Sequence, residues 1–244
     1  MAKRLFDITV SAFLLVFFSP LIVVVLILIW IQDWHNPFYI ANRVGIKGEI
    51  FKMYKFRSMI VNAESSGVDS TGNNDARITK VGHFIRNYKL DELSQMFNVF
   101  LGNMSLVGPR PNVKRETDLY STEEKKILNI KPGVTDLSSI VFADEGQILA
   151  DKKDPDIAYN QLIRPYKSEL AILYVEHQNF LLDLKILILT ALTFLSREKS
   201  LEGVSKIVEN MGGNEDLVEV CKRKAPLIPK APPGHHRIIE TRDI

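Results

Sequence analysis

The sequence predicts an α+β protein that is mostly helical and enters a membrane with its N-terminal segment. An apolar run without a formal charge covers residues 8–31. Short alternating patterns typical of strands occur between residues 38 and 56, and apolar residues at helical spacing recur through the rest of the chain. These three observations predict a helical domain with a short β element beside a membrane segment.

Composition limits the classes to which the protein can belong. The chain has 244 residues, of which 46% are hydrophobic and 25% charged, which suits one folded core with a small appendage. A net charge of +2 is too small for a dedicated nucleic-acid binder. The single cysteine, Cys221, excludes an intramolecular disulfide and a thiolate zinc cluster, and therefore favours a reducing compartment.

The apolar run over residues 8–31 has two interpretations. An uninterrupted helix of this length would rise roughly 36 Å, enough to cross a bilayer core as a single-pass anchor. The run is too long for a cleaved signal peptide, and no small-residue cleavage site follows it. The alternative is a helix-break-helix hairpin that enters and leaves the same leaflet.

Two features favour the re-entrant hairpin. Ser19-Pro20 lies at the centre of the run, where proline removes a backbone donor and predicts a break. The hydroxyl of Ser19 is a candidate partner for a carbonyl freed there. Basic residues flank the run on both sides, which places both ends on the cytoplasmic face. They are Lys3 and Arg4 before it, and Arg43, Lys47, Lys52, Lys55 and Arg57 after it.

Beyond the membrane segment, glycine and proline turns separate the expected elements. Strands are predicted over residues 38–40 and 49–56, and a polar loop over residues 62–75. Helices are predicted over residues 81–86 and 90–100, the second ending before Gly102.

The second half of the chain is expected to be helical. A helix opens at residues 121–124 and closes at Pro132-Gly133, and one or two helices cover residues 159–195. The very apolar stretch 180–195 is expected to lie in the membrane interface. Short helices are predicted over 201–211 and 215–224. The domains are therefore a membrane hairpin (1–34), a cytosolic-face catalytic domain (35–196) and a C-terminal appendage (197–244), through which the protein could form a homo-oligomer.

The candidate chemistry lies between residues 52 and 111. This block contains a series of basic residues and one adjacent carboxylate pair, Asp91-Glu92, whereas no metal-binding cysteine or histidine cluster and no Walker or dinucleotide fingerprint is present. Basic side chains near carboxylates suit a polyanionic substrate carried with a divalent cation. The basic residues singled out in this block are Lys52, Lys55, Arg57, Arg77, Lys80, Arg86 and Arg110. Without further information, a solvated Asp-Glu pair and lipid-headgroup contacts would explain the same residues.

The motifs of this block, in their order, resemble the bacterial sugar transferase family, the small monotopic polyprenyl-phosphate phosphoglycosyl transferases. The motifs are Tyr54-Lys55-Phe56-Arg57-Ser58-Met59, Arg77-Ile78-Thr79-Lys80-Val81-Gly82, Arg86, Leu90-Asp91-Glu92-Leu93 and Met104-Ser105-Leu106-Val107-Gly108-Pro109-Arg110-Pro111. Further matches are Lys3-Arg4 with Asp7, Ser19-Pro20, Lys131-Pro132-Gly133-Val134-Thr135 and Leu182-Asp183. The resemblance covers about residues 3 to 195.

The resemblance implies transfer of a sugar-1-phosphate from a UDP-sugar to polyprenyl (undecaprenyl) phosphate, with release of UMP and with Mg²⁺ as cofactor. It implies that the protein works at the cytoplasmic face of the bacterial inner (plasma) membrane, in the first membrane step of glycoconjugate assembly. Asp91 would be the nucleophile and also contact the metal, and Glu92 would support the metal or act on the acceptor phosphate. The candidate substrate-binding residues are Arg86, Arg110, Lys55 and Arg57, with Pro109 and Pro111 fixing the backbone around Arg110.

The chain departs from the family pattern at four positions, and two alternatives remain open. Ser94 and Asn103 stand where the family commonly has proline and aspartate, Asp136 where it favours glycine, and Ala41 where glutamine is frequent. A non-catalytic membrane scaffold that keeps the fold is the first alternative, and a phosphohydrolase that gives the phosphosugar to water is the second. The dyad and the main basic residues are retained.

Overall fold

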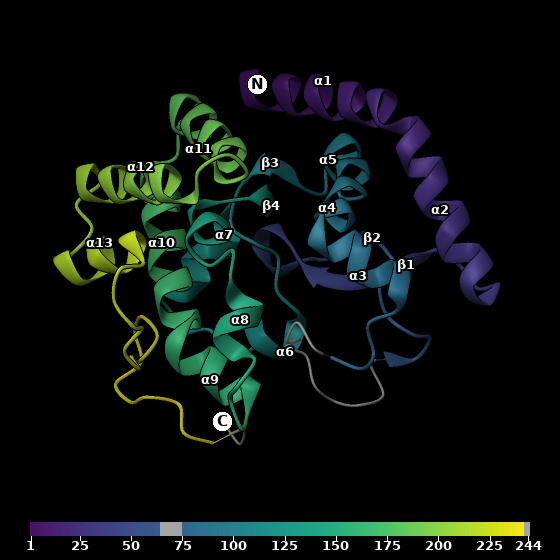
Figure 1. Ribbon diagram of the computed structural model, residues 1–244. Helices are drawn as coiled ribbons and strands as arrows, with labels where there is room; N and C mark the ends of the chain where they lie inside the picture. The colour runs from purple at the N-terminus through teal and green to yellow at the C-terminus, as the bar shows by residue number, and fades with distance from the viewer. Residues whose placement is uncertain (64–74, 242–244) are drawn as a thin grey trace.

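The computed structural model describes residues 1–63 and 75–241. Helices dominate these residues, and the paired strands form two separate two-stranded sheets. Figure 1 shows α1 (Ala2–Phe17) lying across one edge of the helical body, and α2 (Ser19–Asp33) descending along its side. The predicted class, mostly helical with a short β element, is therefore confirmed. Most of the loop predicted over residues 62–75 lies outside the described residues.

The apolar N-terminal segment forms two helices that are bent by 63° at Phe18. Pro20 lacks the N–H that would bond to the carbonyl of Val16, and the hydroxyl of Ser19 donates to that carbonyl at 2.7 Å instead. The predicted break at Ser19-Pro20 is confirmed, together with the partner of the freed carbonyl. Among the described residues no single helix is long and apolar enough to cross a bilayer, whereas the bent pair meets that criterion when its two helices are taken together.

The helix pair buries one face and exposes another. On α2, Ile22, Val25 and Ile29 pack with Phe56 and Ile85 in a small apolar cluster. The opposite face is a continuous exposed apolar surface, of the kind that marks a contact with a membrane or a partner. On α2 it comprises Val23, Val24, Ile27, Leu28, Trp30 and Ile31.

Charged side chains at the start of α1 fasten the helix to the rest of the protein. The Lys3 ammonium forms an ion pair with Asp183 at 2.5 Å and donates to the carbonyl of Val107 at 3.0 Å. The carboxylate of Asp7, which is buried, accepts a hydrogen bond from the backbone N–H of Leu106 at 3.1 Å. These contacts join the apolar helix pair to the strand that precedes the Pro-Arg-Pro turn.

A β-hairpin follows the helix pair. Strands β1 (Phe38–Val44) and β2 (Ile50–Phe56) are antiparallel and are joined by the 3-10 turn η1 (Ile46–Gly48). Ala41 lies opposite Met53 in the register, and both are buried, so the alternating pattern places one face of the hairpin against the main core. The predicted strands are therefore present, the first longer than expected.

The segment after the hairpin is helical but more divided than the sequence predicts. It contains α3 (Lys80–Asn87), α4 (Leu90–Leu93) and α5 (Met96–Leu101). The single helix predicted over residues 90–100 is interrupted at Ser94, whose hydroxyl donates to the carbonyls of Asp91 and Tyr54 at 2.8 and 3.0 Å. Gly102 ends α5 with φ +91°, as predicted.

Two short parallel strands lie next to the Pro-Arg-Pro turn. They are β3 (Ser105–Val107) and β4 (Gly133–Thr135). A Cβ atom on Gly133 would lie 2.0 Å from the backbone nitrogen of Gly108, so this approach requires glycine. Between the strands lie α6 (Lys114–Thr117) and the 3-10 helix η3 (Glu124–Asn129), where the sequence predicts a helix opening at residues 121–124.

The rest of the chain is helical. Its helices are α7 (Leu137–Val141), α8 (Glu145–Leu149), α9 (Pro155–Leu162), α10 (Arg164–His177), α11 (Phe180–Thr193), α12 (Arg197–Asn210) and α13 (Glu215–Lys222). Residues 159–195, for which one or two helices were expected, hold the end of α9 and all of α10 and α11. Pro165 opens α10, and the side chain of Asn179 caps α11 by accepting from the N–H of Leu182 at 2.9 Å.

The C-terminal helices share the main core. Leu201, Val204 and Val208 of α12 and Leu217 and Cys221 of α13 are buried in the cluster that also contains residues of β3, α7 and α10. The segment after α13 then runs back along α9 and α10, as Figure 1 shows in yellow. Residues 197–241, expected as an appendage, therefore contribute part of the domain core.

Replacement of Leu217 by alanine tests this contribution to the core. Leu217 is 1% exposed, so Leu217→Ala should lower the free energy of unfolding by about 2–5 kcal/mol. Ile228, which is 71% exposed in the same C-terminal region, provides the control, and Ile228→Ala should change stability by about 0.5 kcal/mol or less. Denaturant unfolding of the detergent-solubilised protein measures both. Equal, small losses would show that the C-terminal helices do not share the core.

Candidate active site

The carboxylate pair Asp91-Glu92 lies in the first turn of α4, and both side chains are half-buried. Lys89, just before α4, has the left-handed φ of 51°, which turns the chain sharply out of α3. The hydroxyl of Ser94 ties the end of α4 to the carbonyl of Tyr54 on β2. The dyad is therefore carried by a short helix that is fixed to the β-hairpin.

The next helix, α5, is fixed to the same strand of the hairpin. The side-chain amide of Asn98 donates to the carbonyl of Lys52 at 2.7 Å and accepts from the N–H of Tyr54 at 2.9 Å. The guanidinium of Arg4 donates to two carbonyls in the last turn of α5 at 2.5 and 2.7 Å. The dyad is thus connected to both the hairpin and helix α1, a role of Arg4 that charge counting alone does not reveal.

Arg110 reaches the dyad from the Pro-Arg-Pro turn, as the sequence predicts. Pro109 and Pro111 are buried, and the carbonyl of Pro109 accepts a hydrogen bond from the N–H of Gly133 at 2.9 Å. The Arg110 guanidinium is 3.8 Å from the Glu92 carboxylate and remains 39% exposed. The rigid backbone therefore presents an accessible guanidinium beside the dyad.

Lys55 of β2 lies in the same electrostatic environment. Burial, followed by the positive charge of Arg110, lowers the pKa of Lys55 to about 8, although Asp91 and Glu92 act in the opposite direction. No hydrogen-bond or ion-pair partner of the Lys55 ammonium is found within residues 1–63 and 75–241. Its charge is therefore available to an anionic ligand.

Arg86, in the last turn of α3, is a further cation on which the charge of Asp91 acts. Its Nε donates to the hydroxyl of Ser58 at 3.2 Å, and this is the one hydrogen bond that its guanidinium makes in the part of the chain that the structure describes. Burial lowers the pKa of Arg86, and the charges of Asp91 and Asp75 partly offset the effect. Its terminal nitrogens therefore remain able to bind phosphate oxygens.

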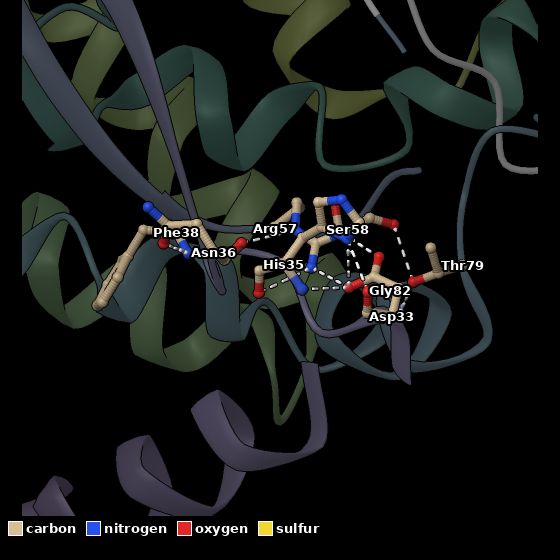
Figure 2. Close-up of polar contacts among 8 residues, drawn as sticks. All are labelled: Asp33, His35, Asn36, Phe38, Arg57, Ser58, Thr79 and Gly82. Atoms are coloured by element: carbon tan, nitrogen blue, oxygen red, sulfur yellow. Dashed lines mark hydrogen bonds and ion pairs between the residues drawn. The ribbon is translucent and has the colours of Figure 1, made fainter. Parts of the chain in front are cut away.

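Arg57 is not brought to the dyad, in contrast to its predicted place among the substrate-binding residues. Figure 2 shows its guanidinium directed at the carboxylate of Asp33, the last residue of α2. Its Nη2 donates to Asp33 Oδ1 at 2.6 Å, its Nη1 donates to the other oxygen, and its Nε donates to the carbonyl of Asn36 at 2.7 Å. Arg57 is 8% exposed, so it is a buried partner of Asp33.

Other basic residues of the block are also placed away from the dyad or are already engaged. Arg77 pairs with Asp75 at 2.6 Å. Lys52 is exposed on β2, and Lys80 is exposed at the start of α3. Of the basic residues singled out in the sequence, Lys55, Arg86 and Arg110 are the three whose charges act on the dyad.

Carboxylates of the dyad and of α8 contribute to the electrostatics around Arg110. Burial raises the pKa of Glu92, an effect that Arg110 opposes and Asp91 reinforces. Glu145, at the start of α8, is paired with Lys167 and also acts on Arg110. Burial would lower the pKa of Arg110, but the surrounding carboxylates outweigh burial and raise it. No local motif marks Glu145 or Lys167, because their place depends on how α8 and α10 pack.

The donor set of the dyad suits Mg²⁺. Magnesium is usually held by one or two carboxylates together with substrate phosphates, rather than by a cage of protein ligands. Within the described ranges there is no group of three or more His, Cys, Asp or Glu side chains that could hold a metal alone.

A cavity of about 220 Å³ lies between α10, α11 and α12, and none of the charged residues described above lines it.

Comparison with known proteins places this site in a family context. The family model described as bacterial sugar transferase matches residues 1–197. The uncharacterized sugar transferase EpsL of Bacillus subtilis is 34% identical over 218 residues, which cover 88% of this chain and 98% of EpsL. The UDP-glucose:undecaprenyl-phosphate glucose-1-phosphate transferase of Klebsiella pneumoniae is 35% identical over 77% of this chain. The undecaprenyl-phosphate galactose phosphotransferase of Salmonella typhimurium is 41% identical over 55% of it.

The matched region contains the whole candidate site. This chain spans 39% of the length of the Klebsiella protein and 31% of the Salmonella protein, but nearly all of EpsL. The bent helix pair, the dyad and the three cations around it all fall within the part matched by the family model, and most of α12 and all of α13 follow it. On this evidence, the chain belongs to the bacterial sugar transferase family.

Proposed function

We propose that this protein transfers a sugar-1-phosphate from a UDP-sugar to polyprenyl (undecaprenyl) phosphate and releases UMP. The observation that carries the proposal is the Asp91-Glu92 dyad, on which the charges of Lys55, Arg86 and Arg110 act. Cations around a carboxylate suit a reaction in which two phosphate-bearing substrates must meet. The relatives named as undecaprenyl-phosphate transferases support the same reaction. The product would begin the membrane stage of O-antigen, capsule, exopolysaccharide or glycoprotein glycan assembly.

In the first step, a carboxylate oxygen of Asp91 attacks the phosphorus that carries the sugar. A bond between that phosphorus and Asp91 forms, the bond to the bridging oxygen of the diphosphate breaks, and UMP leaves with the electron pair. Arg86 and Arg110 bind the phosphate oxygens, and Lys55 adds a third positive charge. Asp91 would also hold Mg²⁺, which would supply positive charge that offsets the negative charge of the phosphates.

In the second step, an oxygen of polyprenyl phosphate attacks the same phosphorus and releases the Asp91 carboxylate. The raised pKa of Glu92 supports a role in accepting the proton of an acceptor that arrives as the monoanion. The new phosphoanhydride joins the sugar phosphate to the lipid. Covalent catalysis of this kind divides one displacement into two and gives ping-pong kinetics.

The proposed location is the cytoplasmic face of the bacterial inner membrane. The bent helix pair has an exposed apolar face, Lys3 and Arg4 lie at its start, and basic residues follow it in the sequence from Arg43 onward; these features favour a hairpin in one leaflet. On α11, Leu181 and Ile188 are also exposed, which supports contact of this helix with the membrane interface. The polyprenyl tail would then stay in the leaflet while the nucleotide sugar arrives from the cytosol.

Replacement of Asp91 by asparagine tests the nucleophile. With Mg²⁺ and the correct UDP-sugar but without acceptor, the protein should gain the mass of one sugar phosphate, because UMP leaves and Asp91 keeps the phosphosugar. Asp91→Asn should show no adduct, and its transfer rate should fall at least about 10³-fold, the scale on which loss of a nucleophile acts. Intact-protein mass spectrometry measures the adduct.

The matched control is Asp118→Asn, because Asp118 lies in an exposed ion pair with Lys114 at 2.6 Å. This variant should form the adduct at the wild-type rate. If Asp91→Asn retained pathway output, catalysis at this dyad would be refuted. UMP release without acceptor and without adduct would favour hydrolysis, and absence of both adduct and UMP over a broad panel of UDP-sugars would favour the scaffold.

The pH dependence of the reaction tests Lys55. Because its pKa is about 8, Lys55 is charged below pH 8 and becomes neutral above it. The value of kcat/KM for the UDP-sugar, which reports the free enzyme, should therefore fall above pH 8 by up to about tenfold per pH unit. Lys55→Arg should move the fall to higher pH, since a guanidinium keeps its charge there. An unchanged profile in Lys55→Arg would assign the fall to another group.

Thiol labelling tests the re-entrant topology. Single cysteines in place of Ala2 and Gln32, both exposed, are introduced into a Cys221→Ser background. A membrane-impermeant reagent should reach both positions from the cytoplasmic side of inverted vesicles and neither from the outside of intact cells. Labelling of the two positions from opposite sides would establish a spanning helix. Pro20→Ala should increase the spanning fraction, because it restores the N–H that the break lacks.

A further inference from the structure

The pair formed by Arg57 and Asp33 joins the end of α2 to the end of β2. Arg57 makes two hydrogen bonds to the carboxylate of Asp33 and two more to the carbonyls of Asn36 and His35. Its own backbone N–H donates to the carbonyl of Pro37 at 2.8 Å. Four of the five N–H groups of the guanidinium are thus engaged before any substrate is present. This geometry fits an anchor and leaves little for a phosphate.

The residue after Arg57 connects this anchor to helix α3, as Figure 2 shows. The carbonyl of Ser58 accepts from the backbone N–H of Thr79 at 3.0 Å, and Thr79 caps α3 by accepting from the N–H of Gly82 at 2.9 Å. A Cβ atom on Gly82 would lie 1.8 Å from the Ser58 carbonyl oxygen, so the two segments are in close contact. Ser58 therefore fixes the position of the first turn of α3.

The side chain of Ser58 acts on the other end of α3. Its hydroxyl accepts the hydrogen bond from Nε of Arg86, at 3.2 Å. A hydrogen bond at Nε restricts the rotation of the planar guanidinium, and it leaves both terminal nitrogens of Arg86 without a partner among the described residues. The charge of Asp91 acts on Arg86, so the held guanidinium belongs to the dyad side of the site.

We propose that Asp33 and Arg57 are positioning residues that set the orientation of Arg86 through Ser58. The proposal rests on the function proposed above, in which Arg86 binds the diphosphate of the donor. It gives Arg57 a role other than the substrate contact that the sequence predicts. It also connects the end of the apolar helix pair to a phosphate-binding residue, since Asp33 is the last residue of α2.

The two roles of Arg57 predict opposite results for Asp33. If Arg57 bound phosphate itself, Asp33→Asn would remove a competing carboxylate and leave donor binding unchanged or tighter. If Arg57 acts through Ser58 and Arg86, Asp33→Asn should weaken Mg²⁺-UDP binding and lower kcat/KM for the UDP-sugar about tenfold. Asp33→Glu, which keeps the charge, should recover part of the loss.

The test is a double-mutant cycle on the full chain in nanodiscs. The dissociation constant of Mg²⁺-UDP is measured by calorimetry, the rate of UMP release by a coupled assay, and the midpoint of thermal unfolding as a control for folding. In an Arg86→Gln background, Asp33→Asn should cost less than about twofold further, because both changes affect one interaction. Ser58→Ala, which removes only the hydroxyl at Arg86, should reproduce the loss with an unchanged unfolding midpoint.

The proposal would be overturned if Asp33→Asn weakened Mg²⁺-UDP binding by the same factor in the Arg86→Gln background as in the wild-type background. It would also be overturned if Asp33→Asn bound Mg²⁺-UDP as tightly as the wild-type protein does. The control Asp118→Asn removes an exposed carboxylate and should leave both readouts unchanged. A wild-type protein that binds Mg²⁺-UDP but releases no UMP would refute the proposed function while the cycle on UDP binding still tests the positioning role. A wild-type protein that binds no Mg²⁺-UDP would refute both.

Discussion

The ion pair between Lys3 and Asp183 is the contact on which the arrangement of the molecule depends. Asp183 is 3% exposed, and a buried carboxylate is stable only when it is paired and hydrogen-bonded. Lys3 supplies the charge, and the hydroxyl of Tyr174 donates a further hydrogen bond at 2.5 Å. Burial and the neighbouring Asp183 raise the pKa of Tyr174, so the hydroxyl stays protonated. Because Lys3 also binds the carbonyl of Val107, the contact that fastens the apolar helix pair lies three residues before Arg110.

The charges of the site are arranged for a ligand that brings more negative charge. Burial disfavours the charged form of Lys55, and repulsion by Arg110 adds to this effect, so the pKa of Lys55 is lowered. The diphosphate of the proposed donor would relieve this repulsion, so part of its binding energy would come from an environment formed in advance. Glu92 and Glu145 act on Arg110 and compensate part of the positive charge, which limits the repulsion among the cations of the site. This balance explains how several cations and a dyad of carboxylates can share one small region.

Local chemistry made several features predictable from the sequence, and long-range contacts account for those that were not. Pro20 dictates the break in the helix pair, and Pro109 and Pro111 dictate the rigid turn at Arg110. The partner of Arg57 could not be predicted, because Asp33 and Arg57 meet only after α2 and β2 have packed. The hydrogen bond from the Ser94 hydroxyl to the carbonyl of Tyr54 could not be predicted either, because Tyr54 lies in a different element.

Two departures from the family pattern also acquire local explanations from the structure. Asp136 caps α7, since its carboxylate accepts from the N–H of Ser139 at 2.6 Å. Ser94 uses its hydroxyl to hold α4 to the β-hairpin, a tie that the proline common at this position in the family could not make. Both residues stabilise the elements that carry the site, and neither removes a charged group from it. Divergence at Ser94 and Asp136 therefore gives no support to a scaffold that has lost catalysis.

The C-terminal helices restrain a segment next to the site. They lie largely beyond the part of the chain that the family model matches. Asp144 forms ion pairs with Arg197 of α12 and with Arg223, which follows α13, at 2.7 and 3.1 Å. Burial would raise the pKa of Asp144, but the two guanidinium groups outweigh burial and lower it, which keeps the carboxylate charged. The next residue, Glu145, acts on Arg110. Asp144 immediately precedes α8, so its two ion pairs fix the start of this helix. The C-terminal helices therefore stabilise the backbone that carries Glu145, a charge of the site. This role accounts for their place in the core.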